Sequence, residues 1–457
     1  MKRSLAALSL FVLSCSAPPA SRPARPTDLA STPARPLAAA KSLPTAKPLP
    51  TAKSLPTAKP LPTATPLQHA DALAELDARI TAVLARAEAQ PTGWLVRGQL
   101  ADLYLTRARL SGDYNDYASA ETQIDRAFAI AGDDAGPYFT RVALNFTLHR
   151  LDRVAADLDR IEQFAIHRDT DRRALAVQRA DLAFQRGDYP AAAIGLEQAL
   201  ASDADITNLA RLALYRWKTG ELLNAEHLYH QALAKLPPGS GEPSAWLHLQ
   251  LGLMDLERGR LDDALAHYND GAAELAGYWL IDEHIAEILT LQGNTDAALA
   301  AYADIIRRTG NPEFMDAVAS IHLAAGRPAE ARVWIDRAGQ IYEAQLERFP
   351  EAAYGHALAH FLEFGSDPAR VVQLAENNHR TRPNAEAKIS LARAYLKAGR
   401  QGDARDAIAG ALATPWRSAD LFAAAAEVYA AASDPASTAT AAKHREQALA
   451  MNPHALD

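Results

Sequence analysis

Two pairs of histidines are spaced so that both imidazoles of a pair fall on one face of a helix. His356 and His360 are four residues apart with Glu363 one turn later, and His227 and His230 are three apart. Two imidazoles at such a spacing can bind one metal ion. Because no glutamate directly follows His356, the first pair lacks the pattern of zinc proteases. Packing and surface polarity are the competing explanation, so a metal-binding or enzymatic protein using His356 and His360 is the alternative hypothesis for this chain.

No other pattern in the sequence predicts catalysis. No strand is predicted before a glycine-rich phosphate loop, and no Gly-x-Ser-x-Gly turn is present. The adjacent carboxylates of Asp262 and Asp263 lie at a predicted turn, where acidic side chains favour the start of the next helix through its dipole. We therefore predict that the protein is not an enzyme. We expect no catalytic residues, no metal, no cofactor and no small-molecule substrate.

The elements that must position these residues are helices in a regular repeat. A short turn, mostly glycine followed by a polar residue, recurs at a nearly constant interval, and residues that favour helices dominate between the turns. The turns are at Gly112, Gly187, Gly220, Gly259, Gly293, Gly326 and Gly399, with less regular versions at Arg150, Gly365 and Ser433. A nearly fixed period of this length predicts a repeat architecture of helical hairpins.

Small side chains recur at fixed distances from the turns. Seven residues before the turn glycine are Ala180, Ala213, Gly252, Ala286, Ala319 and Ala392; five after it are Ala192, Ala225, Ala264, Ala298, Ala331 and Ala404; and nine after it are Tyr229, Tyr268 and Tyr302. A larger substituent at the small positions would force two closely packed helices apart. The pattern therefore predicts that the two helices of each hairpin touch at these positions.

This spacing resembles the tetratricopeptide repeat (TPR) family, whose unit is a helix–turn–helix of about 34 residues. The aromatic residues that the family favours in its first helix are mostly absent, although Tyr395 fits. The resemblance implies an all-α fold, a right-handed superhelical solenoid of about ten TPR-like repeats over residues 67–457. A signal peptide and a disordered proline-rich linker are expected to precede it.

In the resembling family the first helix of each unit lines a concave face, and the turn glycines give the register. The predicted partner-binding groove consists of Phe184, Trp217, Trp246, Leu249, Leu253, Glu283, Glu287, Glu313, Asp316, Arg393 and Lys397. It would run from an apolar and aromatic patch through an acidic stretch to a basic end. Exposed aromatic residues are suitable anchors for a protein partner. In the competing interpretation, Trp217 and Trp246 only fill gaps between units.

The single cysteine, Cys15, follows Lys2, Arg3 and a short apolar run. That run is too short to span a bilayer and is typical of an export signal. The residues Val-Leu-Ser-Cys at 12–15 resemble the lipobox of bacterial lipoproteins. The resemblance implies a signal peptide over residues 1–14, cleavage before Cys15, and a covalent lipid (palmitate among the acyl chains) on that residue. Ser16 goes with delivery to the outer membrane, facing the periplasm; an ordinary secretory signal is the competing explanation.

Residues 15–66 form the predicted lipidated and low-complexity linker. A six-residue unit rich in proline repeats four times over residues 42–65, and such repeats favour extended polyproline conformations that act as spacers. A proline-rich ligand for a partner domain is the alternative. Residues 1–66 hold nine basic and one acidic side chain, which leaves 38 basic and 54 acidic ones in residues 67–457. An acidic body argues against a nucleic-acid partner.

Together these features predict a membrane-anchored TPR scaffold or adaptor in the cell envelope. The solenoid would bind a protein or peptide partner in its concave groove, and the lipid on Cys15 would attach it to the membrane. The sequence does not identify the partner, the pathway, the oligomeric state or the leaflet.

Overall fold

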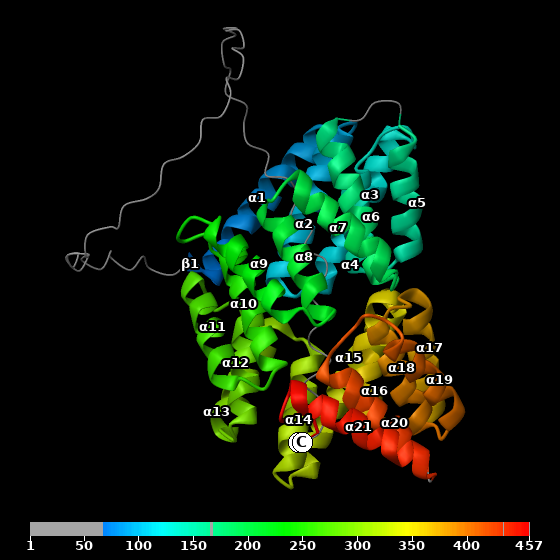
Figure 1. Cartoon of the computed structure of the whole chain (residues 1–457). Coiled ribbons are helices and arrows are strands. Elements are labelled where there is room, and N and C mark those ends of the chain that lie inside the picture. Colours follow the sequence, from blue (N-terminus) through cyan, green and yellow to red (C-terminus); the bar gives the residue numbers. More distant parts are fainter. Residues whose placement is uncertain (1–66, 165–167, 433, 457) are drawn as a thin grey trace, which may run out of the picture. The chain divides into compact units, whose positions relative to one another are not determined.

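The computed structural model describes residues 67–164, 168–432 and 434–456. The predicted signal peptide, Cys15 and the linker to residue 66 lie outside this part of the chain. Within the described residues, α1 is followed by ten helical hairpins in chain order, from α2–α3 to α20–α21 (Figure 1). The two helices of a hairpin pack on one another, and each hairpin packs on the next. This arrangement confirms the predicted all-α solenoid of about ten TPR-like repeats.

The helices begin and end close to the predicted turns. Those of the first half are α1 (His69–Ala89), α2 (Trp94–Ser111), α3 (Tyr114–Ala131), α4 (Tyr138–Thr147), α5 (Leu151–Glu162), α6 (Asp169–Gln185), α7 (Tyr189–Ser202), α8 (Ile206–Lys218), α9 (Leu222–Ala234), α10 (Glu242–Leu256) and α11 (Leu261–Glu274). Those of the second half are α12 (Trp279–Leu291), α13 (Thr295–Thr309), α14 (Pro312–Ala324), α15 (Pro328–Arg348), α16 (Pro350–Phe364), α17 (Pro368–Thr381), α18 (Ala385–Lys397), α19 (Gln401–Leu412), α20 (Ala419–Ala430) and α21 (Pro435–Met451). None of these described helices is both long enough and apolar enough to cross a membrane.

The turns owe their conformation to glycine. All seven glycines of the regular predicted turns have a positive φ, between 70° and 86°. L-residues with a Cβ atom rarely adopt this left-handed conformation, whereas glycine does so without steric cost. The irregular turn at Arg150 uses His149 instead, with φ 55°. In the seven hairpins with a regular turn, the glycine therefore determines where the first helix ends.

The small residues on either side of the turns lie where helices touch. All six alanines at the position five after the turn glycine have no exposed surface. At Gly252 a Cβ atom would lie 2.3 Å from the ring of Tyr268, which is itself fully buried. The predicted contact between the two helices of a hairpin is thus confirmed, and the tyrosine ring occupies the space that the missing side chain leaves.

Substituting Gly252 by alanine is expected to lower the free energy of unfolding by about 1–3 kcal/mol, because the added methyl group overpacks the contact with Tyr268. The matched control is Gly410→Ala in α19, where the new Cβ would meet Lys388 at an ordinary 3.7 Å. That change should be neutral or stabilising by up to about 1 kcal/mol, since alanine favours helices. Chemical denaturation of both variants measures the difference, and equal effects would contradict the packing argument.

Repeats that are far apart in the sequence also contact one another. The two-residue strand β1 (Leu67–Gln68) pairs in parallel with β2 (Leu275–Ala276). The indole Nε1 of Trp279 donates a hydrogen bond of 2.8 Å to the carbonyl of Leu110. Further backbone contacts of this kind join Ala385 to Tyr189 at 2.9 Å and Arg417 to Lys218 at 2.9 Å. A solenoid in which each repeat touches only its neighbours would lack such contacts, so they are a feature of this particular chain.

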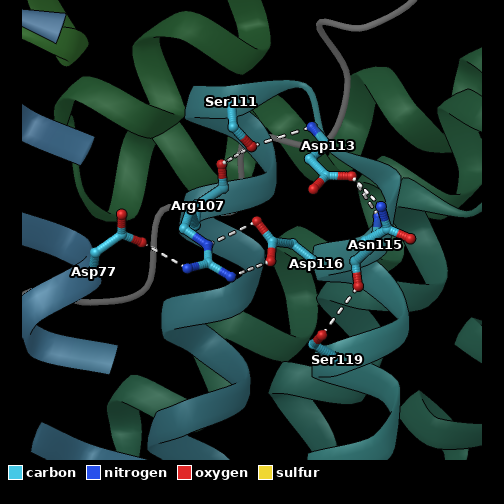
Figure 2. Close-up of polar contacts among 7 residues, drawn as sticks. All are labelled: Asp77, Arg107, Ser111, Asp113, Asn115, Asp116 and Ser119. Carbon is cyan, nitrogen blue, oxygen red and sulfur yellow. Dashed lines mark hydrogen bonds and ion pairs between the residues drawn. The ribbon is translucent and has the colours of Figure 1, made fainter. Parts of the chain in front are cut away.

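The first repeat is joined to α1 by an arginine that binds two carboxylates (Figure 2). Arg107 on α2 donates from Nε and Nη2 to both oxygens of Asp116 on α3, at 2.9 and 2.6 Å, and from Nη1 to Asp77 on α1 at 2.6 Å. Asp113 caps α3 by accepting a hydrogen bond from the backbone of Asn115. A two-pronged arginine–carboxylate contact fixes orientation as well as distance, so Arg107 sets how these three helices pack.

Candidate functional site

The residues of the predicted groove divide into two sets according to their exposure. Seven are buried, namely Phe184, Trp217, Leu249, Leu253, Glu283, Glu287 and Asp316. Four are partly exposed, namely Trp246, Glu313, Arg393 and Lys397. A concave face open to solvent would leave most of these side chains accessible. In the structure the chain itself covers the buried seven, so only the second set is available to a partner, and partner binding in a groove stays a prediction.

Contacts from other repeats cover the aromatic end of the predicted groove. The ring of Phe184 stacks on that of Trp416, with centroids 6.2 Å apart. Trp217 donates a hydrogen bond from Nε1 to Glu257 at 2.8 Å, and the ammonium of Lys218 lies 3.8 Å from the centroid of its ring. These aromatic side chains therefore fill space between repeats, and for Trp217 this agrees with the competing interpretation.

The basic end of the predicted groove also connects helices of the solenoid. Arg393 on α18 pairs with Asp420 on α20 at 2.5 Å and lies 3.5 Å from Glu427. Lys397 donates to the carbonyls of Phe361 and Leu362 at 3.1 and 2.6 Å, near the end of α16. A cation at the carboxyl end of a helix is favourable because it meets unpaired carbonyls and the negative end of the dipole. Both cations thus stabilise the packing of α18.

The acidic stretch contains a buried group on α12 that we call the α12 ion cluster: Glu283, His284 and Glu287. The imidazole of His284 lies between the two carboxylates, with Nε2 2.9 Å from Glu283 and Nδ1 2.9 Å from Glu287. The ring stacks on Tyr268 at a centroid distance of 5.4 Å. None of the three side chains is more than 3% exposed. Both ring nitrogens therefore face a carboxylate, which favours the doubly protonated imidazolium.

Burial and charge shift the titration of this cluster. Removal from water raises the pKa of Glu283 to about 7, although the charge of His284 and its contact act in the opposite direction. Burial alone would lower the pKa of His284, but the adjacent carboxylates outweigh it and raise the pKa to about 10. Groups this close titrate as a unit. Glu283 and His284 therefore hold their protons more tightly in the folded protein than in the unfolded chain.

Two further carboxylate–imidazole pairs join α14 to α16. Glu313 contacts Nδ1 of His356, and Asp316 contacts Nδ1 of His360 at 2.8 Å. Tyr342 on α15 donates its hydroxyl to Asp316 at 3.1 Å. The structure thus brings the predicted acidic stretch and the predicted histidine pair together. Among the described residues, neither His356 nor His360 belongs to a group of three or more side chains whose ligand atoms lie close enough to hold one metal ion.

Among the described residues, two groups have ligand atoms close enough to hold one metal ion. The first is the α12 ion cluster, in which both nitrogens of the histidine already face carboxylates. The second consists of His248, His267 and Asp270 on α10 and α11. Sequence analysis missed this second group because its two histidines belong to different helices and no helical period relates them. The two histidines lie on either side of the turn at Gly259. Pairing the two helices of this hairpin residue by residue could have predicted that they meet.

The other predicted histidine pair is exposed on α9. His227 is hydrogen-bonded at 2.7 Å to Gln231. The ring of His230 lies instead 6.4 Å from that of His267, between centroids. The two members of this pair therefore have different neighbours.

Comparison with known proteins does not assign this chain to a family, but it finds solved structures that are similar to it. No family model and no curated protein matches the sequence. Among solved structures, a tetratricopeptide repeat protein from Parabacteroides merdae is 18% identical and matches 54% of this chain and 93% of its own, with a TM-score of 0.33. The APC/C hetero-tetramer Cut9–Hcn1 is 15% identical over 84% of this chain and 92% of its own, at a TM-score of 0.37. TTC0263, a TPR protein of Thermus thermophilus, is 21% identical over 41% of this chain and 96% of its own, at 0.31.

Two of these three structures are described as tetratricopeptide repeat proteins, and all three are similar to this chain at low identity. The assignment of the fold rests on the helix pairs of this chain, their turns and their spacing. The class of protein that these features define is an all-α, TPR-like repeat protein.

Proposed function

We propose that this protein is a lipid-anchored scaffold that binds a protein or peptide partner in the cell envelope and does not catalyse a reaction. The observation that carries the proposal is the continuous array of ten helical hairpins in the described residues. A repeat array offers an extended surface to partners. The most strongly perturbed ionisable groups described above, those of the α12 ion cluster, are enclosed and engaged with one another, which suits a role in stability.

The proposed mechanism depends on placement. The lipid on Cys15 would hold the protein at the membrane, most simply the outer membrane facing the periplasm. The proline-rich segment would set its reach, up to roughly 150 Å if extended at about 3.1 Å per residue. Confinement to a thin layer raises the effective concentration of a partner without any new contact. Because of this higher effective concentration, a small contact surface could be sufficient to bind the partner.

The proposed partner surface combines one residue of the predicted groove with exposed apolar residues outside it. Trp246 is the partly exposed aromatic residue of that groove. Large apolar side chains are also exposed on the second helices of their hairpins, such as Leu223 on α9 at 80% and Val333 on α15 at 66%. When a partner covers an exposed apolar side chain, its removal from water contributes favourable binding free energy. We therefore include these three residues in the candidate binding surface.

The anchor is tested by substituting Cys15 with serine and separating membrane from soluble fractions. The variant should leave the membrane fraction, since the acyl chains supply the affinity for the bilayer. Retention of Cys15→Ser in the membrane fraction would show that the lipoprotein interpretation is wrong. Radiolabelled palmitate incorporated into the wild type and absent from the variant is the independent measurement.

Partner binding is tested by photo-crosslinking in cells from positions 223, 246 and 333. The control position is Arg172 on α6, whose side chain is 61% exposed and charged. We expect one envelope protein to be captured at the apolar positions and not at the control, and an excess of purified protein to compete with its capture. The same set of products at all four positions would argue against a specific partner surface.

A further inference from the structure

Three histidines and an aspartate meet at the surface of α9, α10 and α11. We propose that His248, His267 and Asp270, with His230 beside them, bind a divalent transition-metal ion, for which Zn²⁺ is the best match. The ligand atoms of the first three residues all lie within 4.8 Å of one another. The ring of His267 is 6.2 Å from that of His248 and 6.4 Å from that of His230, between centroids. We call these four residues the α9–α11 histidine site.

The α10–α11 hairpin brings the ligand residues of this site together from its two helices. His248 lies on α10, while His267 and Asp270 lie one turn apart on α11 and so share a face of that helix. At Gly271, next to Asp270, a Cβ atom would lie 3.3 Å from the Cβ of His248. The absence of a side chain there lets α11 approach α10 closely at the site. The arrangement is therefore built into the rigid part of the repeat.

The nitrogen atoms of the site are available for a ligand bond. Nδ1 of His248 and Nδ1 of His267 are both shielded from solvent and have no hydrogen-bond partner. Nδ1 of His248 is 4.0 Å from Asp270, beyond hydrogen-bonding distance. A buried polar atom without a partner is unfavourable in a folded protein. A metal ion between these atoms would satisfy both nitrogens and the carboxylate at once.

A carboxylate behind His267 supports the same conclusion. Nε2 of His267 lies 3.6 Å from the buried Asp255, which Arg260 holds in place. In metal sites the histidine commonly directs its second nitrogen to a carboxylate, which orients the ring and strengthens it as a ligand. Because Nε2 faces Asp255, Nδ1 is the nitrogen directed to the proposed ion.

The surroundings of His248 disfavour the charged form of its imidazole. Burial lowers the pKa of His248, an effect that the neighbouring imidazoles of His267 and His230 reinforce and the carboxylates of Asp270 and Glu274 oppose. The side chain is therefore neutral at neutral pH, the form in which imidazole binds a metal. Glu274 has a buried oxygen without a hydrogen-bond partner and lies one turn beyond Asp270 on α11.

The set of donors selects the class of ion. Two or three imidazole nitrogens and one carboxylate oxygen suit Zn²⁺ and its neighbours in the transition series, whereas Ca²⁺ and Mg²⁺ prefer oxygen alone. Zinc bonds of about 2.0–2.2 Å require these ligands to move closer together. Asp270 can supply that movement because its side chain is 66% exposed.

The experiment is a titration of the full-length protein, purified without a histidine tag, with Zn²⁺ in competition with a chromophoric chelator. We expect one ion per chain, binding that is lost in His248→Ala/His267→Ala, and binding that is weakened about ten-fold or more in Asp270→Asn. The matched control is His227→Ala, an exposed histidine one turn from His230 on the same helix; its affinity should change less than two-fold. Co²⁺ in place of Zn²⁺ should give the visible absorption of a four-coordinate site in the wild type and in His227→Ala, and not in the double variant.

Circular dichroism of each variant establishes that the solenoid is folded. If the double variant does not fold, Asp270→Asn decides the outcome, because this exposed residue is not part of the core. The proposal is overturned if the wild type binds no stoichiometric Zn²⁺, or if its affinity is the same in the variants of His248, His267 and Asp270. Failure of this site would leave the proposed scaffold function untouched, since neither the anchor nor the partner surface depends on it.

Discussion

Substitution of His284 by alanine is expected to lower the free energy of unfolding by about 3–5 kcal/mol at pH 8. The imidazole is 2.9 Å from each of two buried carboxylates, those of Glu283 and Glu287. Without it the two carboxyl groups must either stay charged in the interior, where they are poorly solvated, or take up a proton at a pH that opposes it. Equilibrium denaturation by urea at fixed pH measures the loss.

The control separates the charge of the α12 ion cluster from its packing on Tyr268. A triple variant, His284→Ala with Glu283→Gln and Glu287→Gln, has the same cavity but no buried charge. It should recover part of the lost stability, because it removes the uncompensated buried charge although the cavity and two buried amides remain. If the triple variant is as unstable as His284→Ala, the loss comes from packing alone and the electrostatic explanation is wrong.

The same cluster predicts how the stability of the wild type depends on pH. The pKa of Glu283 is raised from 4.5 to about 7, and that of His284 from 6.5 to about 10. Between the unfolded and folded values the native state binds more protons than the unfolded state, so the free energy of unfolding falls as pH rises. The contribution of these two groups is therefore complete below about pH 4.5 and is lost progressively up to about pH 10. Denaturation curves at pH 5, 7 and 9 should show this contribution as a slope that is smaller in the triple variant than in the wild type.

Substitution of Trp279 by alanine is expected to cost about 3–5 kcal/mol, as for other large buried side chains. Trp279 is 3% exposed, and it joins α12 to the end of α2 through its hydrogen bond to Leu110. Its ring also lies against Gly112, where a Cβ atom would approach to 3.2 Å. Loss of this side chain should separate the first repeat from α12. Hydrogen exchange should then show faster exchange in α2 and α3 at unchanged protection of α18 and α19.

The matched control for this substitution is Trp334→Ala on α15. Trp334 is partly exposed and its ring contacts the guanidinium of Arg337, so its loss should cost about 1 kcal/mol or less. Equal effects of the two substitutions would contradict a special role for Trp279. So would uniform loss of protection along the whole solenoid, because the contact would then not be local to α2 and α12.

The repeat could be predicted from the sequence because it depends on local conformation. Glycine is required for a left-handed turn, so Gly220 and Gly259 identify turns directly. A small residue is required where two helices of a hairpin touch, so Gly252 and Ala264 identify the contact. Each requirement acts within a single hairpin, a range over which the helical period alone determines which side chains meet.

The exposure of the groove could not be predicted in this way. Phe184 lies on α6, and Trp416 lies in the loop before α20. These segments are far apart in the sequence, so no helical period relates the two residues. The sequence indicated correctly that Glu283 and Glu313 belong to the first helices of their hairpins. It could not indicate that later repeats or other helices cover them, since that depends on the small rotation that accumulates from one repeat to the next.

The sequence by itself determined that the described part of the chain consists mainly of helical hairpins, where the regular hairpins turn and which positions must be small. Steric requirements of single residues and of the helical period are sufficient for these conclusions. Only the tertiary structure decided which charged and aromatic side chains are enclosed, and that His248 and His267 meet across one hairpin while His356 and His360 each meet a carboxylate. The physical reason is that burial and pairing depend on contacts between helices, which local sequence does not encode.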